Sequence, residues 1–313
     1  MRFSLGDDDT GSAENGVTRT SPASAVFVGT ARDCARWLPD VLDNLARLAQ
    51  LYERTAFVFT VSDAADSTAA LLRDWMTNRP GRVIDLGDLS TRLELRTERI
   101  AHARNAGLEA IRGSPWAGYH HLVVADLDDV LAVPLDVDSC ARAAGWIEAS
   151  PDRAAVFASA VPRYYDIWAL RHPTWSPHDC WHRIWERPAA ESFEAAKFRE
   201  VFARQIELPR QMRPIEVSSA FGGLGLYRMS SALNSTYVGL DAQGREISEH
   251  VAFNEAIGRA GGRLHVFPEL QVQAPQQHLY VADEFDFRWR VTMRLRETVE
   301  RYRPAWRTLN DRR

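Results

Sequence analysis

The sequence predicts an α/β fold in which βαβ units build a parallel sheet. Short apolar runs that end at turn residues alternate with stretches in which apolar residues recur at helical spacing. This alternation is the usual pattern of a sheet with crossover helices. One of the runs, residues 121–125, ends directly in three closely spaced carboxylates. With 313 residues and 45% hydrophobic composition, the chain is long enough for one large domain or two small ones.

The first half of the chain carries the clearest pattern. Apolar runs predict strands at 25–28, 56–61, 82–86 and 121–125. Helical spacing predicts helices at 33–52, 67–78 and 97–111. We therefore expect residues 24–135 to form a nucleotide-binding half-sheet.

The second half is less regular, and we expect residues 136–280 to form an acceptor-side subdomain of the same domain. The pattern predicts helices at 139–149 and 190–205 and from 248, strands at 154–159 and 263–267, and a Gly-interrupted strand or turn at 218–227. The polar residues 1–23 are expected to be a disordered leader, and 281–313 a basic amphipathic helix.

Composition excludes several classes of protein. A net charge of −4 argues against bulk nucleic-acid binding. The three cysteines form no C-x-x-C pair, which fits a reducing compartment. No signal peptide or membrane-spanning run is evident, so a cytoplasmic protein is expected. Because Lys197 is the only lysine, a cation that binds phosphate is expected to be an arginine.

The acidic stretch gives the strongest chemical signal. Asp126, Asp128 and Asp129 follow the apolar run of residues 121–125 at once. Like charges this close resist burial, so they belong at the exposed carboxyl end of a strand, where open α/β sheets bind ligands. Carboxylate oxygens suit Mg²⁺ or Mn²⁺, and these ions commonly carry substrate phosphates. We therefore expect metal-assisted chemistry on a phosphorylated substrate.

Further polar residues fall at the ends of the other predicted strands. Thr30-Ala31-Arg32 follows the first strand and Ser62-Asp63 ends the second, while Arg99, Arg104 and Asn105 lie on the helix before the acidic strand. The segment Arg104-Asn105-Ala106-Gly107, followed by a strand and D-x-D-D, closely resembles the A-R-N-x-G helix and D-x-D strand of GT-A glycosyltransferases. The resemblance covers roughly residues 25–280 and depends on the order of its motifs.

Two later motifs extend the resemblance to the acceptor side. These are Phe221-Gly222-Gly223-Leu224-Gly225 and Ser248-Glu249-His250-Val251. In this order they resemble a subgroup that contains fungal capsule-associated mannosyltransferases and related microbial enzymes. The resemblance to this subgroup implies that the chain uses a nucleotide-sugar donor and a carbohydrate or lipid-linked glycan acceptor. It also implies a place in surface polysaccharide or glycolipid synthesis.

The resemblance also implies roles for single residues. Asp128 would ligate Mn²⁺ or Mg²⁺, Asp126 would bind the metal or the ribose, and His278 falls near the position of a C-terminal metal ligand. Arg99 or Arg104 would share the diphosphate charge, and Asp63 would accept hydrogen bonds from the base. Glu249 would be the base that activates the acceptor hydroxyl. The family commonly has Asp after this glutamate, where this chain has His250, which leaves the base and the inverting or retaining outcome open.

Structural explanations stay open beside these roles. Asp129 could cap the next turn, Asp63 could be a turn residue, and Asn105 could serve packing. Arg99 and Arg104 are five residues apart and need not share a helix face. The glycines could form a bulge, and Glu249 could simply begin a helix.

Two segments of unusual composition have alternative interpretations. Residues 163–188 combine tryptophans and tyrosines with His172, His178, Cys180 and His182, whose spacing matches no common zinc site. An acceptor-binding loop and an aromatic mini-core both fit them. Residues 288–313 hold nine arginines against three acidic residues, which suits peripheral contact with an anionic membrane at the inner face or a helix packed on the domain.

The main rival function is a haloacid-dehalogenase-like phosphatase, in which Asp126 would be the nucleophile and Ser159 would stand in for the second motif. The sequence lacks the suitable lysine and the later acidic pair that such a phosphatase needs, and about a hundred residues precede the motif at Asp126. A nucleotidylyltransferase is a weaker alternative, because this sequence lacks the N-terminal Gly-rich signature of that class. A third alternative is a nucleotide- or carbohydrate-binding module without turnover, which Asp126, Asp128 and Glu249 count against.

Overall fold

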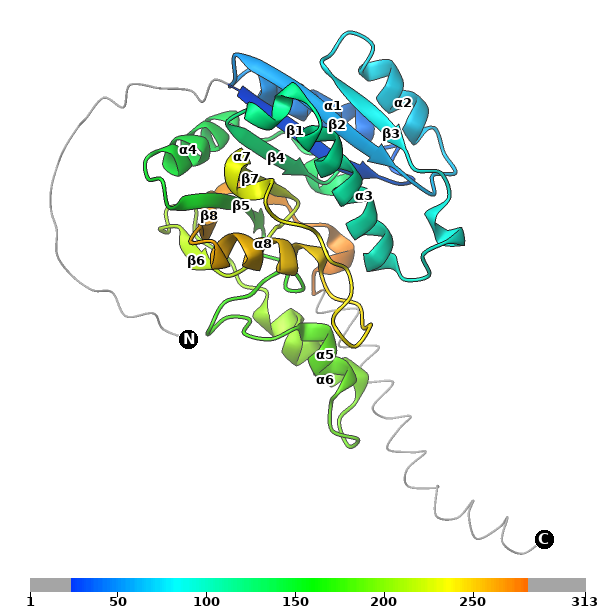
Figure 1. The fold of residues 1–313 in the computed structure, drawn as a ribbon. Coiled ribbons are helices and arrows are strands. Elements are labelled where there is room, and N and C mark those ends of the chain that lie inside the picture. The colour runs from blue at the N-terminus through cyan, green and yellow to red at the C-terminus, as the bar shows by residue number, and fades with distance from the viewer. Residues whose placement is uncertain (1–23, 281–313) are drawn as a thin grey trace, which may run out of the picture.

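A computed structural model describes residues 24–280, which form an α/β fold around one eight-stranded sheet. The predicted leader and the predicted basic helix lie outside the described residues. The strands, drawn in Figure 1, are β1 (Ser24–Ala31), β2 (Arg54–Val61), β3 (Gly81–Asp85), β4 (His121–Ala125), β5 (Arg153–Val161), β6 (Ile215–Val217), β7 (Leu224–Arg228) and β8 (Arg263–Gln273). The predicted α/β class is confirmed.

The sheet has the order β3-β2-β1-β4-β7-β5-β8-β6. β1 to β4 pair in parallel, and β5 pairs in parallel with β8. β7 runs antiparallel between β4 and β5, and β6 runs antiparallel at the edge. The parallel pairing predicted for the first half is therefore present in β1 to β4, while the antiparallel direction of β7 and β6 is a feature that the apolar pattern of a buried strand does not encode.

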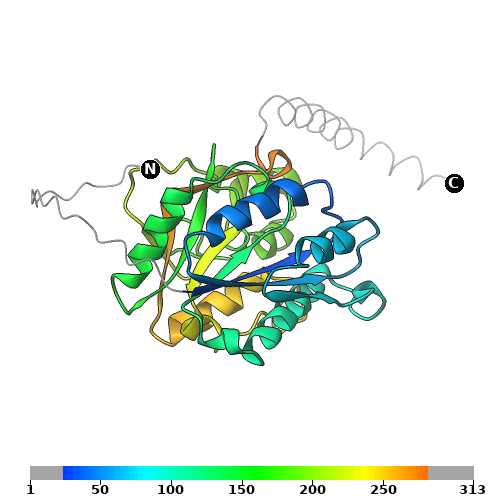
Figure 2. The ribbon, with the colours of Figure 1, turned by 90° about the horizontal axis from the view of Figure 1, so that it is seen from above.

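Helices cover both faces of the sheet, as Figure 2 shows. They are α1 (Leu38–Ala49), α2 (Thr68–Trp75), α3 (Arg96–Arg112), α4 (Val137–Glu148), α5 (Cys180–Trp185), α6 (Phe193–Glu200), α7 (Met229–Ala232) and α8 (Glu249–Arg259). Side chains of α1, α2 and α4 pack on one face, and those of α3 and α8 on the other. The strands alternate between the two cores: Phe27 and Val123 face the first, Val28 and Val124 the second.

Most predicted elements are present, and the differences have local causes. Instead of one helix at 190–205, the chain forms α6 and a 3₁₀ turn at Phe202–Arg204. β8 continues well past its predicted end at residue 267, because a shift in register beside Pro268 lets the strand resume. The sequence pattern did not reveal α5, α7 or the three-residue β6.

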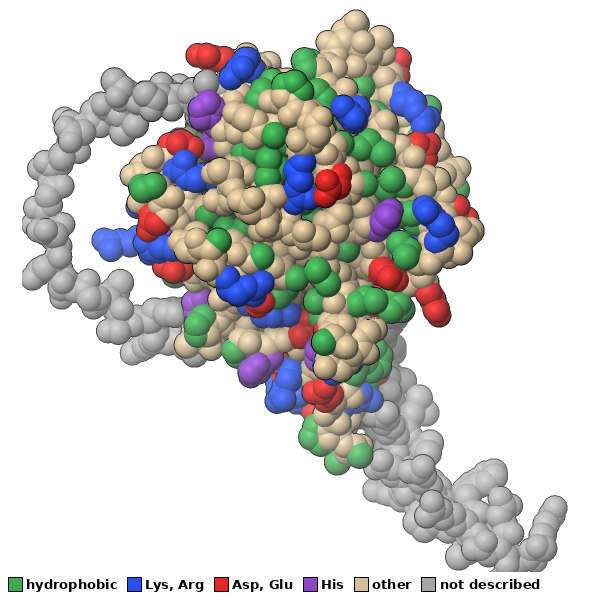
Figure 3. Space-filling view, in the orientation of Figure 1, with side chains coloured by type: hydrophobic (Ala, Val, Ile, Leu, Met, Phe, Trp, Pro, Cys, Tyr) green, Lys and Arg blue, Asp and Glu red, His purple; other side chains and the backbone are tan. Residues whose placement is uncertain are grey.

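The surface carries no large block of one charge on the face in view. Acidic and basic side chains are interspersed there, as Figure 3 shows. Among the described helices, none is both long enough and apolar enough to cross a bilayer.

Candidate active site

The carboxyl ends of β1 to β4 lie at one edge of the sheet because these strands are parallel. Between β1 and β4 the chain order of the strands reverses, and α/β folds bind ligands outside such a point. Arg32, Asp63 and Asp126 each follow one of these strands by a single residue or two. The fold therefore gathers the predicted donor-side residues at one edge.

Arg104 is the centre of this site. Its guanidinium is buried, with only 7% of the side chain exposed. Nε donates to Oε1 of Glu249 at 2.8 Å, and Nη2 donates to Oδ1 of Asp126 at 3.1 Å. It also lies over the rings of Phe221 and Tyr237, at 5.2 Å and 5.7 Å. One cation thus joins three distant parts of the sequence: the R-N-x-G helix, the D-x-D turn and the start of α8.

Helix α3 reaches the sheet closely enough to deliver Arg104 because of Gly107. A Cβ at this position would lie 3.0 Å from Cγ2 of Val28 on β1. The long segment that leads into α8 runs along the same helix, where Asn105 binds both the N–H and the C=O of Tyr237, each at 2.9 Å. Glu246 accepts hydrogen bonds from the N–H and hydroxyl of Thr97. These contacts place Glu249 beside Arg104.

The predicted donor-binding residues separate into two groups. Arg104 and Asp126 meet in the site, but both amide atoms of Asn105 are engaged by Tyr237. Arg99 donates to the carbonyls of Leu93 and Glu94, at 2.8 Å and 2.6 Å. The two arginines therefore point to different surroundings, as their spacing allowed, and the geometry gives Asn105 and Arg99 structural contacts.

Asp126 and Asp128 form a strained electrostatic pair at the end of β4. Burial and the neighbouring Asp128 carboxylate raise the pKa of Asp126 to about 7, against the opposing effect of Arg104. Burial also raises the pKa of Asp128, whose Oδ1 accepts the N–H of Val130. The N-cap of the 3₁₀ turn at Asp129–Leu131 is therefore Asp128, and the expectation that Asp129 caps it is wrong.

The geometry around the acidic pair bears on the predicted metal. The charge of Asp128 raises the pKa of Asp126, and that of Asp129 raises the pKa of Asp128, so a divalent cation would fit here because its charge would relieve this repulsion. Across residues 24–280, however, no three His, Cys, Asp or Glu side chains gather to hold a metal. His278 stacks on Tyr165 at 5.7 Å between ring centroids and acts electrostatically on Asp128. The protein by itself supplies a pair of carboxylates.

Glu249 and His250 lie side by side in the buried part of the site. Nε2 of His250 is 3.5 Å from Oε1 of Glu249, and the His250 ring stacks on Phe221 at 3.8 Å. Neither ring nitrogen makes a hydrogen bond with any described residue. Burial and the charge of Arg104 keep the pKa of His250 well below its usual range, so the ring is neutral.

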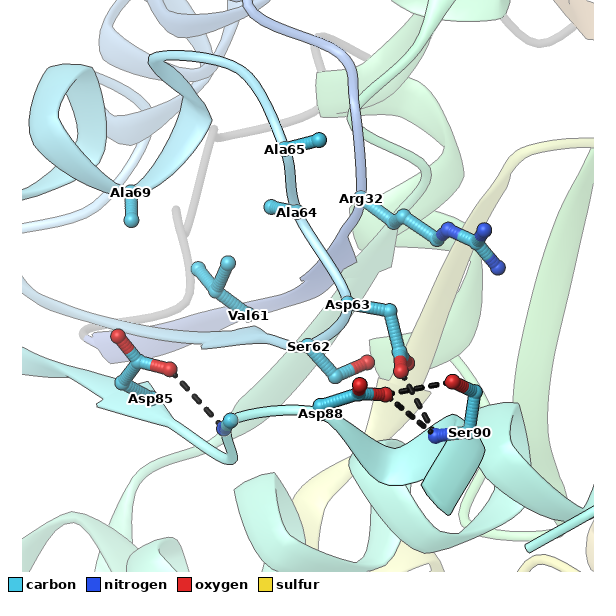
Figure 4. Close-up of a pocket in the computed structure, with 11 residues that line it drawn as sticks. Arg32, Val61, Ser62, Asp63, Ala64, Ala65, Ala69, Asp85, Asp88 and Ser90 are labelled. Carbon is cyan, nitrogen blue, oxygen red and sulfur yellow. Dashed lines mark hydrogen bonds between the residues drawn. The ribbon is translucent and has the colours of Figure 1, made fainter.

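A pocket of about 450 Å³ opens at the ends of β1, β2 and β3, along the same edge of the sheet. Figure 4 shows Arg32 and Asp63 lining it together with Asp88. Asp63 has a left-handed backbone with φ of 52°, and its Oδ1 accepts the N–H of Ser90 at 2.8 Å. Its role as a turn residue is therefore real, and its carboxylate also faces the pocket. Thr30 lies inside β1, opposite Thr60 of β2.

Sequence reasoning missed four residues of the site. Asp85 and Asp88 line the pocket, while from the loop after β5 Tyr165 approaches the acidic pair and Asp166 approaches Glu249. Asp85 stood near the end of the predicted strand at 82–86, so its position was a usable signal. Tyr165 and Asp166 come from an irregular loop with no spacing that links them to the D-x-D turn.

The glycines and the aromatic segment have largely structural roles. Gly222 and Gly223 form a turn with φ of 69° and 89° immediately before β7. In the aromatic segment, Tyr164 is fully buried and stacks edge-on with Trp175, so an aromatic mini-core is present. Among the tryptophans and tyrosines of the segment, Trp185 on α5 is the exposed one, at 65%.

Comparison with known proteins identifies similarity in fold. No protein-family model matches the sequence, and no curated protein sequence matches it. The solved structures that resemble it include a mannosyltransferase from Pyrobaculum calidifontis in complex with GDP-Man and Mn²⁺ (16% identity, TM-score 0.46, 82% of this chain and 59% of that chain). They also include S. aureus TarS (12%, 0.48, 84% and 38%) and its residues 1–349 in complex with UDP-GlcNAc (13%, 0.46, 83% and 62%). The chain thus spans less than two thirds of each of these structures.

Proposed function

We propose that the protein is a metal-dependent GT-A glycosyltransferase that moves a sugar from a nucleotide-sugar to a hydroxyl acceptor. The observation that carries the proposal is the buried Arg104 guanidinium, bound at once to Asp126 of the D-x-D turn and to Glu249 of α8. A donor-side carboxylate and a candidate base are thereby held on two sides of one cation.

The donor would lie along the carboxyl edge of the sheet. The pocket at Arg32, Asp63 and Asp88 suits the nucleoside, because free carboxylate oxygens accept hydrogen bonds from hydroxyl and amino groups. The diphosphate would extend toward Asp126 and Asp128, which would hold Mn²⁺ or Mg²⁺ jointly with phosphate oxygens. When bound, the ion supplies positive charge for the departing nucleotide.

Glu249 is the candidate base for the acceptor hydroxyl. Its Oε1 is fixed by Nε of Arg104, and Nε2 of His250 lies 3.5 Å from the same oxygen. Because His250 is neutral, it adds no second positive charge that would weaken the basicity of the carboxylate. His250 would thus shape the position of Glu249 by packing between it and Phe221.

The phosphatase alternative is less well supported by the same geometry. Its nucleophile would be Asp126, whose Oδ1 is bound by Arg104. The only lysine, Lys197, instead lies over the rings of Trp181 and Phe202 on the α5–α6 side. A phosphatase of this class would need that lysine beside the nucleophile to stabilise the phosphoryl group.

Two variants separate donor binding from turnover. Asp128→Asn should abolish Mn²⁺-dependent binding of a nucleoside diphosphate, measured by titration calorimetry, while the melting temperature is retained. Glu249→Gln should keep that binding and lose release of nucleotide from the nucleotide-sugar. Unchanged affinity in Asp128→Asn would contradict the metal assignment, and full turnover in Glu249→Gln would place the base elsewhere.

The biological setting follows the resemblance only. We propose surface polysaccharide or glycolipid synthesis, with a carbohydrate or lipid-linked acceptor, at the cytoplasmic face of a membrane. Contact of residues 288–313 with anionic lipid belongs to this proposal, and those residues lie outside the described part of the chain.

A further inference from the structure

Asp166 is a half-buried carboxylate to which the proposed chemistry gives no role. It follows β5 by five residues, and both of its oxygens bind main-chain N–H groups. Oδ2 accepts from Gly222 at 3.0 Å, and Oδ1 accepts from Ala169 at 3.3 Å. Its charge acts on Glu249 and on His278, so it lies at the site without contacting either the metal pair or Arg104 through a hydrogen bond.

The turn that Asp166 holds has little space to move. A Cβ at Gly222 would lie 2.6 Å from the carbonyl oxygen of Ala158, and one at Gly223 would lie 2.4 Å from Cγ1 of Val130. Both glycines have positive φ. The turn is therefore wedged between the end of β5 and the 3₁₀ turn that follows the D-x-D residues.

The same turn holds the backbone of Asp126. The carbonyl of Gly223 accepts the N–H of Asp126 at 2.9 Å, just beyond the last residue of β4. A second contact of the same loop, between the hydroxyl of Tyr164 and the N–H of Phe221, is longer at 3.4 Å. A continuous path of bonds thus runs from Asp166 through Gly222 and Gly223 to Asp126.

We propose that Asp166 is a positioning residue that fixes Asp126 through the Gly222–Gly223 turn. The proposal rests on the proposed function, because Asp126 matters through the donor and metal that it would bind. A carboxylate accepts N–H bonds more strongly than a neutral oxygen does, and this chain has placed one where two main-chain donors converge. Loss of this anchor should free the turn, and Asp126 should lose its fixed position.

The test compares three variants with the wild type. Asp166→Ala removes both acceptors, and Asp166→Asn keeps the shape and one acceptor oxygen. Glu200→Ala is the control, since Glu200 is a carboxylate at least as well buried but is bound by Arg199 and Arg204 on and beside α6. The readout is Mn²⁺ affinity by electron paramagnetic resonance of free Mn²⁺, with saturating UDP or GDP, whichever the wild type binds.

We expect Asp166→Ala to weaken Mn²⁺ binding about 10- to 100-fold, as loss of a supporting contact behind a metal ligand does. Asp166→Asn should weaken Mn²⁺ binding roughly threefold or more, because one of the two main-chain N–H groups then faces the side-chain NH₂, which cannot accept a hydrogen bond. The Mn²⁺ affinity of Glu200→Ala should stay within about twofold of the wild type, even if its melting temperature falls as far as that of Asp166→Ala. Circular dichroism establishes that each variant is folded.

Equal Mn²⁺ affinity in the wild type and in Asp166→Asn would overturn the positioning role, and this holds even if Asp166→Ala does not fold. Equal weakening in Glu200→Ala would do the same, because the effect would then be one of general stability. A wild type that binds no Mn²⁺ with any nucleoside diphosphate would overturn the proposed function itself, and with it this role. The two failures are therefore distinguishable.

Discussion

At the scale of single residues, the buried positive charge of Arg104 organises the site. Arg104 has two carboxylate partners and two aromatic neighbours, so its desolvation is offset on every side. The arrangement explains why Glu249, itself 9% exposed, can begin a helix in the interior. Removing Arg104 would leave both carboxylates without their counter-charge.

Arg104→Met should therefore destabilise the fold strongly. A methionine of similar length leaves Glu249 buried without a counter-charge, and breaking a buried pair in this way costs about 3–5 kcal/mol. The free energy of unfolding in urea measures the loss. Arg73→Met is the control, because its pair with Asp85 is about half exposed and should contribute no more than about 1 kcal/mol. Similar losses in the two variants would show that Arg104 is not specially placed.

His265 should make the protein sensitive to acid. Burial lowers its pKa from 6.5 to about 4, opposed by Glu216 at 3.9 Å. The unfolded chain therefore binds a proton at higher pH than the folded chain does. The stability contributed by the neutral His265 ring is complete above about pH 6.5 and is lost as the pH falls toward 4. The loss in the free energy of unfolding has an upper limit of about 3 kcal/mol.

The measurement is the unfolding free energy at pH 7 and pH 4.5 in the wild type and in His265→Phe. The variant should lose less stability between these two values, since a phenyl ring beside Trp146 cannot be protonated. Other groups titrate in both proteins, so the difference between the two slopes isolates His265. Parallel slopes would argue against a neutral buried imidazole.

At the scale of elements, the turn before β7 fixes the end of β4. β7 lies between β4 and β5, and its preceding glycines contact residues that follow both strands. The turn thus connects the predicted nucleotide-binding half to the acceptor half. An antiparallel strand at this place lets residues from the second half reach the D-x-D carboxylates.

Gly223→Ala should test how closely this turn is packed. The left-handed backbone alone costs an alanine about 1 kcal/mol, and overpacking against Val130 adds about 1–3 kcal/mol. Gly244→Ala is the matched control, because Gly244 has φ of 75° but a Cβ there would meet nothing within 4 Å. Thermal unfolding should separate the two variants by several degrees. Equal melting temperatures would mean that the turn can relax without cost.

Prediction from sequence succeeded where a local pattern determined an element. β1, β2 and β4 are continuous apolar runs, and α1 and α3 have a repeating apolar face, so their places could be found. α5 and β6 are short and depend on tertiary contacts for their existence, which no local pattern records. Strand direction in the second half was hidden for the same reason.

At the scale of the whole molecule, the site could be predicted only in part. Asp126, Asp128 and Glu249 were identifiable because their motifs occur in a known order, and the fold brings Asp126 and Glu249 onto the same arginine. Arg99 and Asn105 had equally good sequence signals but bind the backbone of neighbouring loops. Asp166 and Tyr165 required the fold, because their loop enters the site from a distant part of the chain.

We propose above all that the carboxyl edge of the sheet binds a nucleotide-sugar with a divalent cation. Carboxylates that line the pocket, a repelling acidic pair and a buried arginine all lie at this edge. Ligands that bind only the folded state raise its apparent stability by mass action. This linkage allows a donor to be found without knowledge of the acceptor.

The most direct measurement is a thermal-shift panel of UDP-, GDP-, CMP- and dTDP-sugars, each with and without Mn²⁺, on the wild type and on Asp128→Asn. We expect a rise in melting temperature for one nucleotide class, dependent on Mn²⁺ and absent in Asp128→Asn. No rise with any donor, together with phosphate release from simple phosphoesters, would contradict the proposal and favour the phosphatase.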